Sequence, residues 1–189
     1  MRDSDLFKLG ALLFALSGAA NIIADLVPGT AWFNLAGVAA GILGLPALYL
    51  VQRRAIGLSG LVAALLAGLG LIGIAGFLFA DAAIFPALAE DTVAAITEGG
   101  AGLAIFAAVI LYVLGVLAFA AASWRGAVLP RAGLALWAVG TAPTVAAIAL
   151  PPVVMTVAEI VAGAGVVWLA QAVWRRAERE AHSTDGAGA

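Results

Sequence analysis

One carboxylate stands inside an apolar run, and its position suggests chemistry more than that of any other residue. Glu159 lies within the apolar segment 153–174, which has the length of a transmembrane helix. An ionised carboxylate costs several kcal/mol in hydrocarbon, so its side chain is expected to face protein or water, or to be protonated. Glu159 can therefore be a proton or cation site, or a structural group that holds helices together through hydrogen bonds. Both interpretations stay open.

Other polar side chains fall at about the same depth on neighbouring apolar segments. Asn21 and Asp25 are one helical turn apart, and Asn34 follows the next turn of the chain at a similar level. The opposite half of most segments is almost purely Ala, Leu, Val and Gly. The sequence therefore predicts an outward-facing polar pocket with an apolar floor. Its expected members are Glu159, Thr144, Thr141, Thr156, Asn21, Asp25 and Asn34.

Enzyme motifs do not account for these polar residues. The tetrapeptide Gly57-Leu58-Ser59-Gly60 resembles the GxSG motif of rhomboid intramembrane proteases, which also have a six-helix core. Those enzymes pair the serine with a histidine on another transmembrane helix, whereas the only histidine here is His182 in a polar tail. A serine without a general base is not activated. We expect no catalytic residue, metal site or cofactor, and we interpret the chain as non-enzymatic.

The composition is typical of an integral membrane protein. Hydrophobic residues make up 65% of the chain and charged residues 11%. Several uninterrupted apolar runs reach roughly 20 residues, the length that crosses a bilayer. The absence of cysteine excludes disulfides and thiol chemistry. The sequence thus predicts an all-α polytopic protein whose surroundings are the lipid bilayer, and nothing in it indicates nucleic-acid binding.

Hydropathy and helix-breaking residues predict six transmembrane helices arranged as three hairpins in a single domain, 1–180. The expected spans are 6–27, 31–51, 56–80, 101–123, 132–150 and 153–174. A short amphipathic helix is expected in the extracytoplasmic loop 81–100, and a disordered cytoplasmic tail at 181–189. Pro46 and Pro143 each remove a backbone N–H inside an expected span, so both helices are expected to kink.

The distribution of basic residues predicts the orientation. All nine Lys and Arg fall at the two termini or in the loops after the second and fourth spans, which lie on one side of the membrane. The positive-inside rule assigns this side to the cytoplasm. Both termini are therefore expected to be cytoplasmic, in a plasma (inner) membrane, and the opposite surface is acidic.

Small residues at four-residue intervals predict close contacts between helices. Gly37 and Gly41 share a face of the second span, and Gly60, Ala64 and Gly68 share a face of the third. We interpret these faces as packing within the chain. Contact with another membrane protein or with a second copy of the chain is the alternative.

Two functions remain compatible with these features. In the first, the protein is a non-enzymatic accessory, assembly or sensing component with an outward-facing polar pocket. In the second, it is a small transporter or channel for protons, cations or a small solute that uses Glu159. A permeation path needs polar or hydrated groups through the whole membrane. The scarcity of such groups in the inner half favours the first function.

Overall fold

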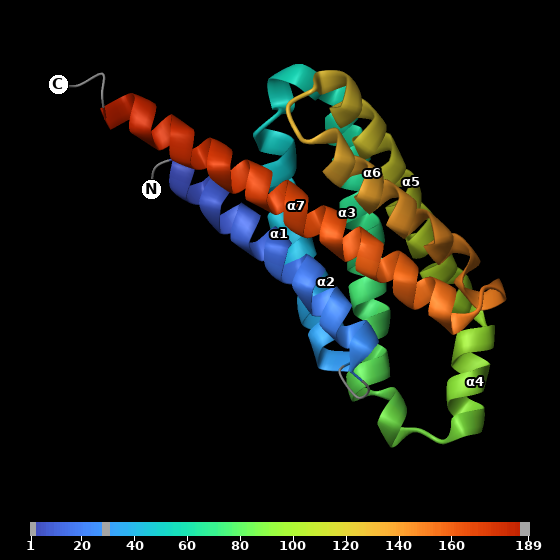
Figure 1. Cartoon of the computed structure of the whole chain (residues 1–189). Coiled ribbons are helices and arrows are strands. Elements are labelled where there is room, and N and C mark those ends of the chain that lie inside the picture. The colour runs from blue at the N-terminus through green and yellow to red at the C-terminus, as the bar shows by residue number, and fades with distance from the viewer. Residues whose placement is uncertain (1–2, 28–30, 186–189) are drawn as a thin grey trace.

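The computed structural model describes residues 3–27 and 31–185, and every element in this part of the chain is helical (Figure 1). The elements are α1 (Asp3–Leu26), α2 (Ala31–Leu50), α3 (Arg53–Ala83), η1 (Phe85–Ala87), α4 (Glu90–Glu98), α5 (Gly100–Gly126), α6 (Arg131–Thr141), η2 (Ala142–Ala149) and α7 (Pro152–Asp185). The helices α1, α2, α3, α5 and α7 are long and apolar enough to cross a membrane. The prediction of an all-α protein with several membrane-length helices is confirmed.

The segment 132–150 differs from the single kinked helix that the sequence predicts. Its α-helical part, α6, ends at Thr141 after 11 residues and passes into the 3-10 segment η2, in which Ala146 has non-helical angles (φ −104°, ψ 17°). Pro143 explains the change, because it has no N–H and its ring clashes with the carbonyl four residues earlier. Pro46, in contrast, lies inside α2, which continues as an α-helix to Leu50.

Two other boundaries differ from expectation. Helix α3 begins at Arg53, earlier than the expected span, and Gly57 interrupts it with φ 52° and ψ −143°. Helix α7 continues to Asp185, so residues 181–185 are helical where a disordered tail was expected, and 186–189 lie outside the described residues. Before this extension, side chains one turn apart pair along α7, since Arg176 lies 3.2 Å from Glu180.

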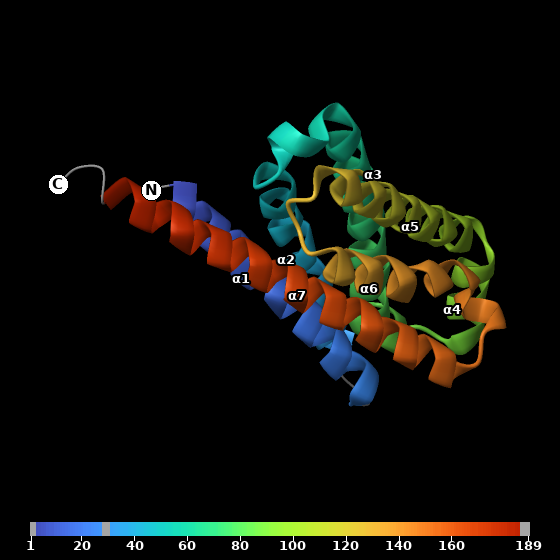
Figure 2. The same ribbon diagram turned by 45° about the horizontal axis from the view of Figure 1, so that its top comes forward.

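The helices pack largely in chain order. Each of α1, α2, α3, α5, α6 and α7 contacts the next, and α7 returns to pack along α1. Figures 1 and 2 show α1 and α7 side by side, with α4 connecting the far ends of α3 and α5. In the part of the chain that the structure describes, the main packing partner of α4 is α5. Five of the polar residues singled out above line a cavity between these helices.

An aromatic layer, consisting of Phe14, Phe119 and Trp137, forms the centre of the core. The ring of Trp137 meets Phe14 edge to face with centroids 5.5 Å apart, and meets Phe119 at 6.0 Å. Such pairs are favourable beyond the area they bury. The fully buried aliphatic residues of the core are Leu48, Leu134, Leu169, Val116 and Val173. This part of the interior is therefore apolar and densely filled.

Glycines bring the backbones together around the aromatic layer, and they do so in the same way in two hairpins. A Cβ added to Gly44 of α2 would lie 2.9 Å from the carbonyl oxygen of Gly10 in α1. A Cβ added to Gly165 of α7 would lie 2.9 Å from the carbonyl oxygen of Gly133 in α6. Both distances are too short for a side chain, so the α1–α2 and α6–α7 contacts depend on glycine.

Candidate functional site

A cavity of about 140 Å³ lies between α1, α2, α3, α5, α7 and the α6–η2 junction. We call it the carboxylate pocket, after Glu159. Its polar lining includes five of the seven residues that the sequence predicts together: Asn21, Asn34, Thr141, Thr144 and Glu159. The remaining lining residues are Val38, Leu71, Ile74, Leu78, Tyr112, Gly140 and Ala162. Side chains from segments far apart in the sequence thus converge on one small cavity.

The other two predicted members do not line the cavity. Thr156 is half-buried on α7, one turn before Glu159, and is not among the lining residues. Asp25 belongs to α1, but its side chain lies outside the described residues. The pocket is therefore smaller than the set of polar residues that the sequence suggests.

Two atoms around the carboxylate pocket are buried without a hydrogen-bond partner in the described part of the chain. They are Oδ1 of Asn21 and Oγ1 of Thr141. A buried polar atom without a partner costs about 1–3 kcal/mol. A cavity of about 140 Å³ has room for a few water molecules or a small ligand that would satisfy these atoms. The pocket is thus suited to a hydrogen-bonding occupant.

Tyr112 is a lining residue that the sequence reasoning missed. Its hydroxyl lies near the indole N–H of Trp137 and the hydroxyl of Thr141, and it interacts electrostatically with Glu159. Nε1 of Trp137 and Oγ1 of Thr141 nevertheless form no well-aligned hydrogen bond within residues 3–27 and 31–185. The available signal was a tyrosine in the middle of an apolar run, because a buried tyrosine hydroxyl usually needs a partner.

Glycine at position 37 makes room for the pocket. A Cβ added there would lie 2.6 Å from Oδ1 of Asn21, and one added to Gly41 would lie 2.8 Å from Oγ of Ser17. Both predicted packing glycines of α2 therefore face polar side chains of α1, namely Ser17 and Asn21. Without side chains at these positions, α2 can approach Ser17 and Asn21 and close that wall of the cavity.

The predicted small-residue face of α3 is not where that helix comes closest to a neighbour. The atoms nearest to a Cβ on Gly60 would be those of Ile56 in its own helix, and a Cβ on Gly68 would lie 4.0 Å from Leu45. Ala64 is half-buried and packs against the core. The close approach to α5 occurs at Gly70, where an added Cβ would lie 2.6 Å from the Cα of Tyr112. Gly70 thus sets how near Tyr112 stands to the pocket.

The aromatic layer blocks the pocket on the side toward the N-terminus of α1. Phe14 precedes Asn21 by about two turns of α1, and Phe119 follows Tyr112 by about two turns of α5. Trp137 lies about one turn before Thr141 on α6, and its side chain is 2% exposed. Together with the buried aliphatic residues, these rings leave the carboxylate pocket with an apolar floor.

The serine of the GxSG sequence has a local partner. Ser59 donates its hydroxyl hydrogen to the carbonyl oxygen of Ile56 at 2.9 Å, a common backbone contact within helices. Within the described residues, no three His, Asp or Glu side chains lie together in a way that could hold a metal ion.

The pocket combines a carboxylate, an amide oxygen and several hydroxyl groups, which are ligands suited to a small cation, a proton or a polar solute. Comparisons of the chain with protein-family models, with curated proteins and with solved structures find no match. A function is therefore inferred from the residues that line the pocket.

Proposed function

We propose that the protein is a non-enzymatic multi-pass membrane component whose carboxylate pocket binds a small cation or hydrogen-bonding solute, in an accessory or sensing role. The observation that carries this proposal is a polar cavity that ends at an apolar floor. Asn21 and Thr141 contribute buried polar atoms that lack partners in the described structure, and the buried ring of Trp137 belongs to α6 about one turn before Thr141. Such a site can bind and release from one side without conducting.

The proposal includes six membrane crossings with both termini in the cytoplasm of an inner membrane. At about 1.5 Å per residue in α6 and about 2 Å per residue in η2, these segments together reach roughly 30 Å, the thickness of the hydrocarbon core. Tryptophans accompany the basic residues at one end. Nζ of Lys8 lies 5.9 Å from the ring of Trp174, and Cζ of Arg131 lies 5.6 Å from that of Trp124. Both features are typical of the cytoplasmic interface.

A transporter or channel for protons, cations or a small solute is the second candidate. The observation that favours it is the break at η2, because Thr144 of this segment lines the same pocket as Glu159. Broken helices near a buried carboxylate expose backbone carbonyls that can coordinate a moving ion. The apolar floor argues against this candidate in the described conformation, since an ion would have to cross the aromatic layer.

A flux assay separates the two candidates. Proteoliposomes with an imposed pH gradient, and with Na⁺ or K⁺ gradients, would be compared for the wild type and Glu159→Gln. Glu98→Gln, which changes an exposed carboxylate on α4, is the matched control. We expect vesicles of all three proteins to remain tight. A flux in the wild type and control that Glu159→Gln abolishes would establish transport and overturn the accessory role.

Binding would be measured separately on the purified protein. A ligand that binds only the folded state raises the melting temperature with its concentration. We expect Na⁺, K⁺, ammonium or a small amide to stabilise the wild type and the Glu98→Gln control, and Glu159→Gln to lose this response. If every probe shifts the three proteins equally, the carboxylate pocket binds none of these ligands.

A further inference from the structure

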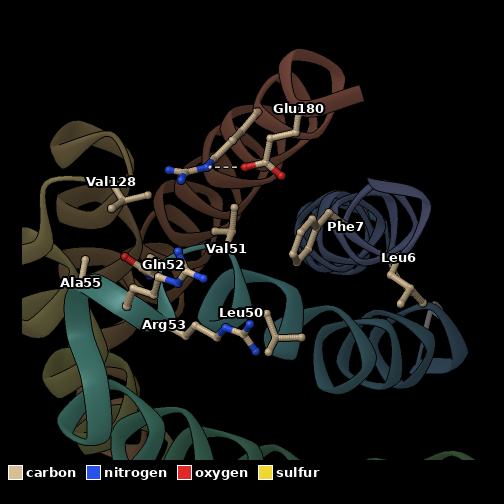
Figure 3. A pocket seen from close by; sticks show the side chains of 11 residues that line it. Leu6, Phe7, Leu50, Val51, Gln52, Arg53, Ala55, Val128 and Glu180 are labelled. Atoms are coloured by element: carbon tan, nitrogen blue, oxygen red, sulfur yellow. Dashed lines mark hydrogen bonds and ion pairs between the residues drawn. The ribbon is translucent and has the colours of Figure 1, made fainter. Parts of the chain in front are cut away.

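A larger pocket, of about 420 Å³, lies at the end of the molecule where the basic residues gather (Figure 3). We call it the arginine pocket. It lies between the start of α1, the joint of α2 and α3, the loop after α5 and the end of α7. Its lining residues are Leu6, Phe7, Leu50, Val51, Gln52, Arg53, Arg54, Ala55, Val128, Arg176 and Glu180.

The charge in this pocket is predominantly positive. Arg53 and Arg54 are exposed, and their guanidinium groups form no ion pair or hydrogen bond within the described residues. Arg176 uses its Nε to pair with Glu180, the one carboxylate among the lining residues, at 3.2 Å. Three guanidinium groups therefore face one carboxylate. Guanidinium groups are well suited to binding phosphate, because their planar N–H donors match its oxygens.

The backbone that carries Arg53 and Arg54 is held in place by its neighbours on both sides. Gln52, which precedes them, is 2% exposed, and its Nε2 donates a hydrogen bond to Oγ of Ser123 in α5 at 2.8 Å. Gly57, with its positive φ of 52°, sets the turn that carries Arg53 and Arg54 apart from the rest of α3. Oε1 of Gln52 is buried with no partner among the described residues. An acceptor is thus available to a donor group that fills the pocket.

The wall of the arginine pocket toward α1 and α2 is apolar and exposed. Leu6 is 50% exposed and Leu50 is 42% exposed, and Figure 3 shows Leu50 near Arg53 and Leu6 near Phe7. In a helix that crosses a bilayer, such side chains contact acyl chains. An anionic group held by the arginines would therefore lie next to lipid. This juxtaposition distinguishes the pocket from a site for an anion dissolved in the cytoplasm.

We propose that the arginine pocket binds the phosphate group of an anionic phospholipid, with Arg53, Arg54 and Arg176 around the headgroup. The acyl chains then lie along Leu6 and Leu50. Basic pockets between transmembrane helices at the cytoplasmic side are suited to such headgroups. This proposal is independent of what the carboxylate pocket binds, because the lining residues of the two pockets do not overlap.

Lipid binding to the full chain in detergent tests the proposal. Affinities for phosphatidylglycerol and phosphatidylcholine would be measured by native mass spectrometry. We expect the Arg53→Gln/Arg54→Gln variant to weaken phosphatidylglycerol binding by about fivefold per arginine, or roughly 30-fold in all, and to leave phosphatidylcholine unchanged. Arg125→Gln, which removes an arginine that lines neither pocket, is the control. An equal loss of phosphatidylglycerol affinity in the control would show that the basic surface attracts the lipid without a specific site.

A second variant is expected to strengthen phosphatidylglycerol binding, and it removes a negative charge instead of a positive one. Glu180→Gln leaves Arg176 without its 3.2 Å partner, so phosphatidylglycerol should bind about fivefold more tightly. Inorganic phosphate and glycerol phosphate serve as competitors. If millimolar amounts of either displace the lipid fully, the site takes free phosphate and the lipid assignment is wrong. If Glu180→Gln does not strengthen binding, Arg176 takes no part in the site.

Discussion

The carboxylate pocket and the arginine pocket differ in size, charge and position. The first is a cavity of about 140 Å³ between the helices, and the second is a pocket of about 420 Å³ at one end of them. A single carboxylate with hydroxyl and amide groups lines the first, whereas guanidinium groups dominate the second. A charge is costly in the interior and cheap at the interface. The difference therefore shows how burial limits the chemistry available to each site.

The aromatic layer separates the two pockets. It lies between Glu159 in the interior and the basic residues at the end of the helices, and Trp137 is its most central member. Changes in one pocket should consequently have little effect on binding in the other, because the sites share no lining residue and are divided by rigid packing. Four predictions test or refine this separation.

Removing the ring of Trp137 should have the largest effect on stability. Trp137→Ala would leave a cavity in the core and cost about 3–5 kcal/mol of unfolding free energy. It would also remove the ring that separates the carboxylate pocket from the core on the side toward the N-terminus of α1. Unfolding in mixed micelles with increasing SDS measures the loss. Trp168→Ala, at a site that is 47% exposed, should cost much less. Equal losses would mean that the layer is not the centre of the core.

A methyl group added at Gly37, in the wall of the carboxylate pocket, should have a smaller effect on stability. Gly37→Ala would place a methyl group 2.6 Å from Oδ1 of Asn21 and should cost about 2 kcal/mol through overpacking. The change in melting temperature reports it. Gly76→Ala is the control, since an added Cβ there meets nothing within 4 Å. Phospholipid binding should be unchanged in both variants. An altered lipid affinity in Gly37→Ala alone would contradict the separation of the pockets.

The turn that carries the arginines should respond to backbone strain alone. Gly57→Ala adds a methyl group with nothing within 4 Å, yet a φ of 52° with ψ of −143° is accessible almost only to glycine. We expect a loss of roughly 1–2 kcal/mol in unfolding free energy and weaker phosphatidylglycerol binding. Ligand stabilisation through Glu159 should be retained. A variant as stable as the wild type would mean that this turn relaxes freely.

The smallest effect on stability is expected inside the carboxylate pocket. Thr141→Val replaces a buried hydroxyl that lacks a partner in the described structure, so stability should change by less than about 1 kcal/mol or even rise. The same change should reduce stabilisation by the pocket's ligand. Thr156→Val, outside the lining, is the comparison. If both variants respond to ligand like the wild type, the Thr141 hydroxyl does not contact the occupant.

The polar pocket was largely predictable because helix depth follows from counting residues away from each turn. That reasoning brings Asn21, Asn34, Thr141, Thr144 and Glu159 to one level, and the structure places them around one cavity. It cannot fix how each helix is rotated. The close approach of α3 to α5 at Gly70 was therefore not anticipated, and Tyr112 was missed because a single tyrosine in an apolar run gives no periodic signal.

The break at Pro143 was predictable in position but not in form. A proline removes one helical hydrogen bond, and whether the chain then bends or changes to a tighter helix depends on what packs against it. Pro46 lies in a helix that continues, whereas Pro143 lies where α6 gives way to η2. The sequence marks both positions equally. The extension of α7 to Asp185 was also missed, because the segment after Glu180 has no apolar face to indicate a helix.

The shortness of α6 has a consequence for how the protein is made. A helix of 11 residues cannot cross a hydrocarbon core by itself, and the 3-10 turns that complete its length hold their hydrogen bonds less well. Inserting such a segment into lipid by itself would be costly, because poorly bonded backbone groups would contact hydrocarbon. We therefore expect this segment to integrate only after α7 has been synthesised. In the six-crossing arrangement that we propose, α6 with η2 and α7 would enter the bilayer as one unit, with α7 as the driving member.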